Sequence, residues 1–184
     1  MDIVKKQDIL LNTVKRELEK NQRKNLERNE SARKELEAFK LLDNRDNRQK
    51  YQLWLELSSD PTERRCPFTG NVISVSDLYS DKVEIEHLLP YSATLDDSMA
   101  NKTLCFREAN REKGNRSPHE AFGNSPKGYD WEEIWARAQN LPGNKRWRFL
   151  PGAMKKFDEE GGFLERQLND TRYISRYTKE YLET

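Results

Sequence analysis

Apolar positions are sparse in the first quarter of the chain and recur at helical spacing. They predict a helix over residues 3–42, in which charged residues of both signs fill most other positions. The apolar positions form two groups, Val4, Leu11, Val14 and Leu18, then Leu36 and Phe39. Residues 29–31 are a candidate break between them. The charges are typical of a solvated helix face with i,i+4 ion pairs, and a connector that touches nucleic-acid phosphates is the alternative.

The middle of the chain changes from helical to alternating spacing. Residues 49–57 predict an amphipathic helix with Trp54 in the core, and residues 66–71 predict a tight turn. In residues 83–87, β-branched and acidic residues alternate, so we expect a strand there. The pattern continues as a loop over residues 88–100, a strand over 103–106 and a helix over 107–113 that ends at Gly114.

The last third of the chain predicts further helices. Ser117 and Asp130 are candidate helix caps, each with a glutamate three residues later. The second of these helices has an apolar stripe of Trp131, Ile134, Trp135, Ala138 and Leu141. Residues 145–149 interleave basic and aromatic side chains, which favours an edge strand or a packed loop over nucleic-acid binding. Residues 161–162, Gly-Gly, predict a hinge before a final helix over residues 164–181.

Composition narrows the fold class and the compartment. Of 184 residues, 34% are hydrophobic and 35% are charged, which favours a small core and a mostly helical α+β fold. The formal net charge of +1 means that a nucleic-acid surface must be a local patch. Two cysteines without a Cys-x-x-Cys pair favour a reducing compartment and argue against a disulfide or zinc framework. No apolar run reaches the ~20 residues of a membrane span, so we expect a cytoplasmic protein with no membrane partner.

The stretch from residue 83 to residue 116 concentrates the candidate chemistry. Glu86 and His87 end the first predicted strand, while Asn110 and Lys113 share one face of the predicted helix. A carboxylate and an amide oxygen suit a hard cation such as Mg²⁺, histidine can activate water, and lysine can stabilise phosphate charge. Together they predict metal-dependent phosphodiester hydrolysis. Neighbours on a strand point to opposite faces, so Glu86 and His87 can serve one phosphate only if the strand ends or twists there.

Three segments of this stretch resemble one known family. Glu-Ile-Glu-His-Leu-Leu-Pro-Tyr-Ser at 84–92, Leu-Asp-Asp-Ser-Met-Ala-Asn-Lys-Thr-Leu at 95–104 and Glu-Ala-Asn-Arg-Glu-Lys-Gly-Asn at 108–115 carry the likeness. They resemble the HNH nuclease domain of type II CRISPR RNA-guided DNA endonucleases, most like the compact II-C branch. The resemblance implies a small ββα-metal core with two short antiparallel strands, surrounded by helices, with long helical extensions at both ends.

The resemblance also implies roles for particular residues. His87 falls on the general base, and Glu86 and Asn110 fall on the ligands of one Mg²⁺ or Mn²⁺ ion. Asn101 falls on the middle asparagine of the motif, which holds the loop and the histidine in place. Lys113 falls on a basic residue near the scissile phosphate. Glu86 departs from the family, which usually has aspartate there, and its longer side chain affects metal position and preference. Candidate nucleic-acid contacts are Lys102, Arg107, Arg111 and Arg116.

A domain organisation and a set of partners follow from the same resemblance. Residues 1–47 would be a helical linker from a RuvC-like segment, residues 48–150 the HNH domain with its core at 66–122, and residues 151–184 a linker into the next RuvC-like segment. The expected partners are the DNA strand paired to a guide RNA, the remainder of a larger bacterial nuclease in antiviral defence, and an inhibitor protein as a further candidate. The isolated chain is expected to be a monomer.

Two other interpretations stay open. One is a free-standing HNH nuclease of the homing or restriction type, which would cut DNA without RNA. The other is a non-catalytic conformational relay or interaction module, which the long charged helix and the Gly-Gly hinge favour. Metal binding that depends on Glu86 and Asn110 would separate an enzyme from a relay.

Overall fold

The computed structural model describes residues 3–159, and side chains near the N-terminus are described from residue 15 onward, with Asn12. The chain divides into two compact units, the first ending at Gln52 and the second beginning at Leu53. Their elements, in order, are α1 (Ile3–Ala38), α2 (Arg45–Leu57), η1 (Pro61–Glu63), α3 (Val75–Leu78), β1 (Val83–His87), α4 (Tyr91–Thr94), η2 (Met99–Asn101), β2 (Lys102–Phe106), α5 (Arg107–Lys113), α6 (Pro118–Phe122), α7 (Trp131–Ala138), α8 (Gly143–Arg146), η3 (Trp147–Phe149) and α9 (Ala153–Glu159).

The first unit is dominated by one helix. α1 runs through residues 29–31 without interruption, so the predicted break is wrong. Asn29 accepts a hydrogen bond from Gln52 Nε2 at 2.9 Å, so it serves a tertiary contact instead of a cap. The long charged helix is confirmed up to Ala38, four residues short of the predicted end. Within residues 3–159, no helix combines the length and apolar character that a membrane crossing needs.

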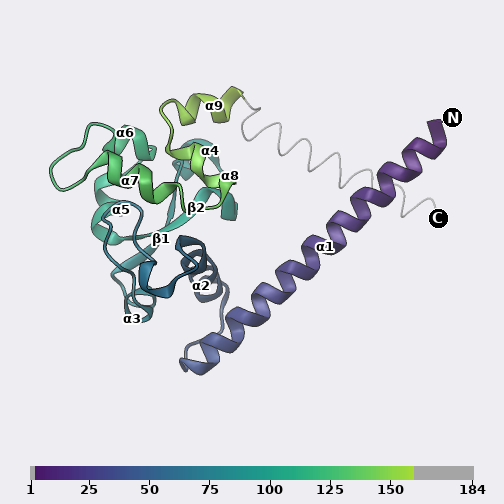
Figure 1. Cartoon of the computed structure of the whole chain (residues 1–184), viewed down its shortest axis with the longest axis horizontal. Coiled ribbons are helices and arrows are strands. Elements are labelled where there is room, and N and C mark those ends of the chain that lie inside the picture. Colours follow the sequence, from purple (N-terminus) through teal and green to yellow (C-terminus); the bar gives the residue numbers. More distant parts are fainter. Residues whose placement is uncertain (1–2, 160–184) are drawn as a thin grey trace. The chain divides into compact units, whose positions relative to one another are not determined.

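A two-stranded antiparallel sheet lies at the centre of the second unit. β1 and β2 pair from Val83↔Phe106 to His87↔Lys102, and α5 follows β2 without a loop (Figure 1). The predicted mostly helical α+β fold with a strand, strand, helix core is therefore confirmed. Its buried core includes Leu88, Leu89, Leu104, Phe68, Phe122, Ile134 and Phe149. Trp54 is buried as predicted and donates from Nε1 to the Ile73 carbonyl at 2.7 Å.

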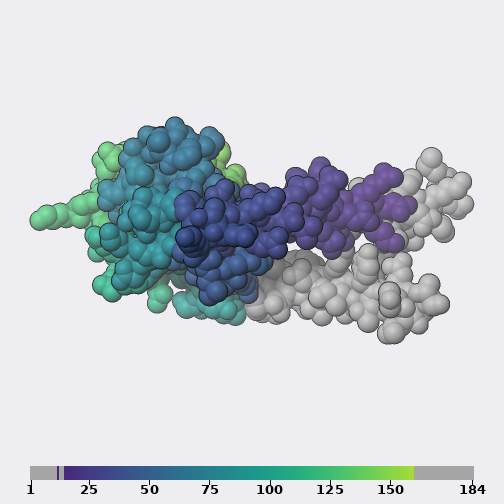
Figure 2. All heavy atoms as spheres, turned by 90° about the horizontal axis from the view of Figure 1, so that it is seen from below, coloured from purple at the N-terminus to yellow at the C-terminus, as the bar shows by residue number. Residues whose placement is uncertain are grey.

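Local sequence signals fix several of the helix ends. Ser117 and Glu120 form a capping box at α6, and Asp130 accepts from the Glu133 backbone N–H at the start of α7. The exposed loop over residues 123–130 joins these helices and projects from the second unit, in green in Figures 1 and 2. Gly114 ends α5 with a φ of 52° and a ψ of −144°, a conformation that favours glycine.

The prediction of an edge strand or loop at residues 145–149 is wrong. The segment forms the helical turns α8 and η3, and two of its basic side chains are buried. Lys145 pairs with Glu56, and its Nζ donates to the Lys102 carbonyl at 2.6 Å. Arg148 lies 3.3 Å from Asp96 Oδ2. These partners, distant in sequence, explain why an alternating basic and aromatic pattern does not form a strand here. The predicted hinge at 161–162 and helix at 164–181 lie outside the described residues.

Candidate active site

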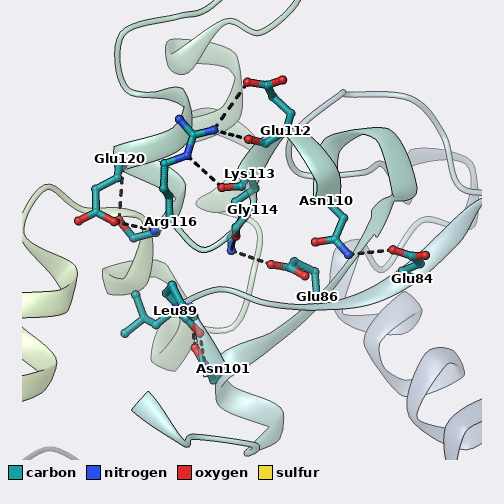
Figure 3. Close-up of polar contacts among 12 residues, drawn as sticks. Glu84, Glu86, Leu89, Asn101, Asn110, Glu112, Lys113, Gly114, Arg116 and Glu120 are labelled. Carbon is teal, nitrogen blue, oxygen red and sulfur yellow. Dashed lines mark hydrogen bonds and ion pairs between the residues drawn. The ribbon is translucent and has the colours of Figure 1, made fainter. Parts of the chain in front are cut away.

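Glu84 and Glu86 point to the same side of the hairpin, toward α5. Successive side chains on a strand alternate between its faces, so these two glutamates share a face that Val83, Ile85 and His87 do not. α5 covers that face and supplies the partners of both carboxylates (Figure 3). Because α5 starts directly after β2, its register against the glutamates is fixed by the strand pairing.

Glu86 and Lys113 form a close ion pair. Lys113 Nζ lies 2.6 Å from Glu86 Oε1. The lysine side chain is fully buried, and that of the glutamate is only 13% exposed. Such a buried ammonium requires the carboxylate as a partner. The structure thus brings together two of the residues that the sequence predicted to share a site.

Asn110 is oriented by Glu84, a residue that the sequence prediction did not include. Its Nδ2 donates to Glu84 Oε2 at 2.8 Å, and Arg107 Nε donates to Glu84 Oε1 at 2.7 Å. The hydrogen bond from Asn110, aided by Arg107, holds the pKa of Glu84 below its usual range. An ionised carboxylate only accepts hydrogen bonds, so Glu84 fixes the amide with its nitrogen inward and its oxygen pointing away (Figure 3).

His87 lies at the end of the strand and on its other face. β1 ends at His87, as it must if Glu86 and His87 are to serve one phosphate from opposite faces of the strand. The ring is in contact with the following loop: Nε2 lies 3.0 Å from Asp97 Oδ1, and the ring centroid lies 5.2 Å from that of Tyr91. Among the described contacts, none joins the His87 side chain directly to Glu86 or Asn110. Among these residues, the structure therefore does not bring the His87 side chain into contact with the two predicted metal ligands, and His87 adjoins Glu86 only along the strand.

Asn101 holds the loop that follows His87. Its side chain is fully buried and bonds the backbone of Leu89 in both directions, accepting from N at 2.9 Å and donating to O at 3.0 Å. Its Nδ2 also donates to the Asp96 carbonyl at 3.0 Å, and its own carbonyl accepts from Leu88 N. Figure 3 shows the paired bonds to Leu89. These contacts fix both ends of the loop against the hairpin.

The candidate nucleic-acid contacts have different environments. Lys102 is 5% exposed and pairs with Asp97, and Arg107 bridges Glu84 and Asp81. Arg111 and Arg116 are exposed. Arg107 and Arg111 line a cavity of about 690 Å³ beside α5 whose lining also includes Asn71 and Phe106. His87 and Glu86 do not line this cavity, so it is separate from the residues that carry the predicted chemistry.

The oxygens of Glu86 and Asn110 fit a hard divalent cation. In the part of the chain that the structure describes, neither Glu86 Oε2 nor Asn110 Oδ1 has a hydrogen-bond partner. One carboxylate and one amide oxygen suit Mg²⁺ or Mn²⁺ that keeps several waters. Within residues 3–159, no three His, Cys, Asp or Glu side chains gather into a group that could hold a metal ion.

Two residues that contact the site were not part of the sequence prediction, and only Glu84 had a signal that could have identified it. Glu84 stands two positions before Glu86, and strand alternation alone places both on one face. Asp97 is ten residues from His87, and only the folded loop brings it to the ring. Its position could not be inferred from strand or helix spacing.

Comparison with known proteins agrees with this geometry. Residues 66–119 match a family model described as HNH endonuclease. The chain is 42% identical over 118 residues to CRISPR-associated endonuclease Cas9 1 of Streptococcus thermophilus, covering 61% of this chain and 10% of that protein. It is 41% identical over 123 residues to Cas9 of Campylobacter jejuni, covering 64% of this chain and 12% of that protein.

A solved structure extends the likeness to the fold. The crystal structure of Streptococcus thermophilus Cas9 in complex with AGGA PAM aligns with a TM-score of 0.67 at 30% identity, covering 94% of this chain and 17% of that one. The chain spans about a tenth of the length of these two curated relatives. Its central region is therefore an HNH endonuclease domain that matches the HNH regions of Cas9 proteins.

Proposed function

We propose that the chain is the DNA-cleaving HNH domain of a CRISPR RNA-guided nuclease and hydrolyses the strand paired to the guide RNA. The observation that supports it best is the arrangement of Glu84, Glu86, Asn110 and Lys113 between β1 and α5, beside His87 at the strand end. The relatives that share this region are named as CRISPR-associated endonucleases.

His87 acts as the general base in this proposal. It takes a proton from the attacking water, whose oxygen bonds to phosphorus while the bond to the leaving sugar oxygen breaks. The leaving oxygen takes its proton from solvent. A bound Mg²⁺ or Mn²⁺ would polarise the phosphate and stabilise the leaving oxygen. Glu86 and Asn110 would hold it, and Lys113 keeps the charge of Glu86 balanced.

Domain boundaries are part of the same proposal. Residues 1–47 and 151–184 serve as linkers to RuvC-like segments, and residues 48–150 form the nuclease domain. The division of the chain near Gln52 lies close to the proposed first boundary. The remainder of the nuclease, the guide-paired DNA and an inhibitor protein are the proposed partners.

Metal titration of the chain tests the site without relying on cleavage. We expect Mn²⁺ to broaden the NMR signals of Glu86 and Asn110, and Glu86→Gln and Asn110→Ala each to weaken binding at least about tenfold. Glu132→Gln, an exposed charge removal on α7, is the matched control. Binding that is unchanged in both site variants would exclude this metal site and favour a non-catalytic relay. Cleavage of duplex DNA by the chain without RNA would favour a free-standing nuclease.

A further inference from the structure

The ring of His87 is held by a carboxylate that is itself held by a lysine. Asp97 Oδ1 lies 3.0 Å from His87 Nε2 and 2.7 Å from Lys102 Nζ. The hairpin register places Lys102 directly opposite His87, so these two residues that contact Asp97 come from one pair of the ladder. One carboxylate oxygen thus joins the last residue of β1 to the first residue of β2.

This contact differs from an ordinary surface ion pair. The side chain of Asp97 is 52% exposed, but that of Lys102 is 6% exposed and that of His87 is 26% exposed. Surface pairs between flexible, exposed side chains contribute little, whereas a nearly buried lysine has few alternative positions. Its hydrogen bond also holds the pKa of Asp97 below the usual range, so the carboxylate stays ionised.

The loop that carries Asp97 is braced on both sides. The neighbouring Asp96 accepts a hydrogen bond from Ser98 N at 3.1 Å and forms an ion pair with Arg148. The side chain of Asp96 is only 8% exposed and that of Arg148 only 3%. Asn101 bonds the backbone at Asp96 and Leu89. A residue set on such a loop can hold another side chain in one orientation, which a residue on a loose loop cannot.

The charge state of Asp97 assigns the proton of the ring. A carboxylate can only accept, so His87 must donate from Nε2. In the neutral imidazole the unprotonated nitrogen is then Nδ1. We propose that Asp97, held by Lys102, is the positioning residue that keeps the proton of His87 on Nε2 and leaves Nδ1 as the atom that accepts the proton of water. This inference rests on the proposed role of His87 as general base.

The first test measures cleavage of the guide-paired strand under single-turnover conditions by the guide-programmed enzyme that carries this chain. We expect Asp97→Ala to lower the rate constant about 10- to 100-fold, below the full contribution of a general base, without weakening DNA binding. Asp97→Glu should restore part of the rate, and Lys102→Met should lower it in the same direction. Glu132→Gln should leave it unchanged. A faster Asp97→Ala enzyme would show that Asp97 restrains the base instead, and an unchanged one would overturn the proposal.

A double variant separates this inference from the proposed function. If Asp97 acts through His87, then Asp97→Ala causes no further loss in a His87→Ala background. A further loss of the full size would overturn the inference while leaving His87 as the base. Normal cleavage by His87→Ala alone would instead overturn the proposed function.

Spectroscopy of the chain tests the contact itself, independent of catalysis. In long-range ¹H–¹⁵N spectra we expect a resolved Nε2–H proton of His87 that is lost in Asp97→Ala and kept in Glu132→Gln. A proton on Nδ1 in the unsubstituted chain would contradict the assignment. A folded Asp97→Ala chain with an unchanged Nε2–H signal would do the same.

Discussion

The orientation of Asn110 depends on a single neighbouring carboxylate. An asparagine offers either its oxygen or its nitrogen to a ligand, and only the oxygen binds a metal. Glu84 Oε2 accepts a hydrogen bond from Asn110 Nδ2 at 2.8 Å, which leaves the amide oxygen available for the metal. In metal sites, residues that orient a ligand in this way affect affinity without touching the ion.

We therefore predict that Glu84→Gln weakens Mn²⁺ binding about 10- to 100-fold. The neutral amide can donate as well as accept, so it no longer forces the oxygen of Asn110 outward. Calorimetric titration of the chain with Mn²⁺ measures the effect. Asp81→Asn removes the other carboxylate that contacts Arg107 and serves as the control. Equal affinities in all three chains would contradict an orienting role for Glu84.

Lys113 makes a different contribution, to stability. Replacing it with methionine leaves Glu86 partly buried with no cation beside it. We expect Lys113→Met to lower the free energy of unfolding by about 3 kcal/mol, the lower end for a broken buried pair because Glu86 retains some exposure. Urea unfolding followed by circular dichroism measures this change. A second substitution, Glu86→Gln, should recover part of the loss, and no recovery would show that packing rather than charge is responsible.

Single residues were predictable where spacing determined their place. Asn110 and Lys113 followed from the helical three-residue interval, Glu86 was chosen as the carboxylate next to the histidine, and the structure puts Glu86 with Lys113. Asp97 was missed because a loop path, not a regular repeat, brings it to His87. The pairing of Asn110 with Glu84 was missed because the prediction followed only the residue next to the histidine.

At the scale of elements, α8 and η3 brace the loop between the two strands. Arg148 of η3 reaches Asp96, and Lys145 of α8 reaches the first residue of β2. Burial lowers the pKa of Lys145, and Glu56 opposes that effect. The helical turns thus connect residues far along the chain to the loop that carries Asp97.

The ion pair between Asp96 and Arg148 makes the contact between η3 and the loop sensitive to acid. Burial raises the pKa of Asp96, but its hydrogen bonds from Ser98 and the charge of Arg148 outweigh burial and lower it. A carboxylate whose pKa is lower in the folded state adds stability above its unfolded pKa of about 4, and that stability is lost as pH falls through the folded value. We expect Asp96→Asn to cost about 2–3 kcal/mol at pH 7 and far less at pH 3.

Urea unfolding at the two pH values measures that difference. Glu132→Gln should show no comparable change between them, because its carboxylate is exposed on α7. An Asp96→Asn chain that is equally destabilised at pH 7 and pH 3 would show that the loop depends on shape or hydrogen bonding, not on the charge of Asp96.

Elements with strong local signals were predicted well. The bounds of β1 and α5 agree with the sequence pattern, and β2 begins one residue earlier. The short turns α4 and η2 within the predicted loop, and α8 and η3, were missed. Of these, α8 and η3 have tertiary partners, Glu56 and Asp96, which a local pattern does not contain.

At the scale of the whole molecule, the chain carries the HNH region but covers only 10% and 12% of the two Cas9 relatives compared. Guide pairing and recognition of the DNA are therefore proposed for a larger assembly. In RNA-guided nucleases of the Cas9 type, docking of the HNH domain controls cleavage. We propose that the domain supplies the chemistry and that its flanking segments attach it to the rest of that assembly.

Cleavage of the guide-paired strand by the intact enzyme with His87→Ala tests whether His87 is the general base. With Mg²⁺ present and DNA binding measured in parallel, we expect cleavage to slow by about 10²- to 10⁴-fold while binding is retained, because the general base is lost. Glu132→Gln should cut that strand at the unsubstituted rate. Unchanged cleavage of the guide-paired strand by His87→Ala would contradict the assignment of His87 and the active site built around it.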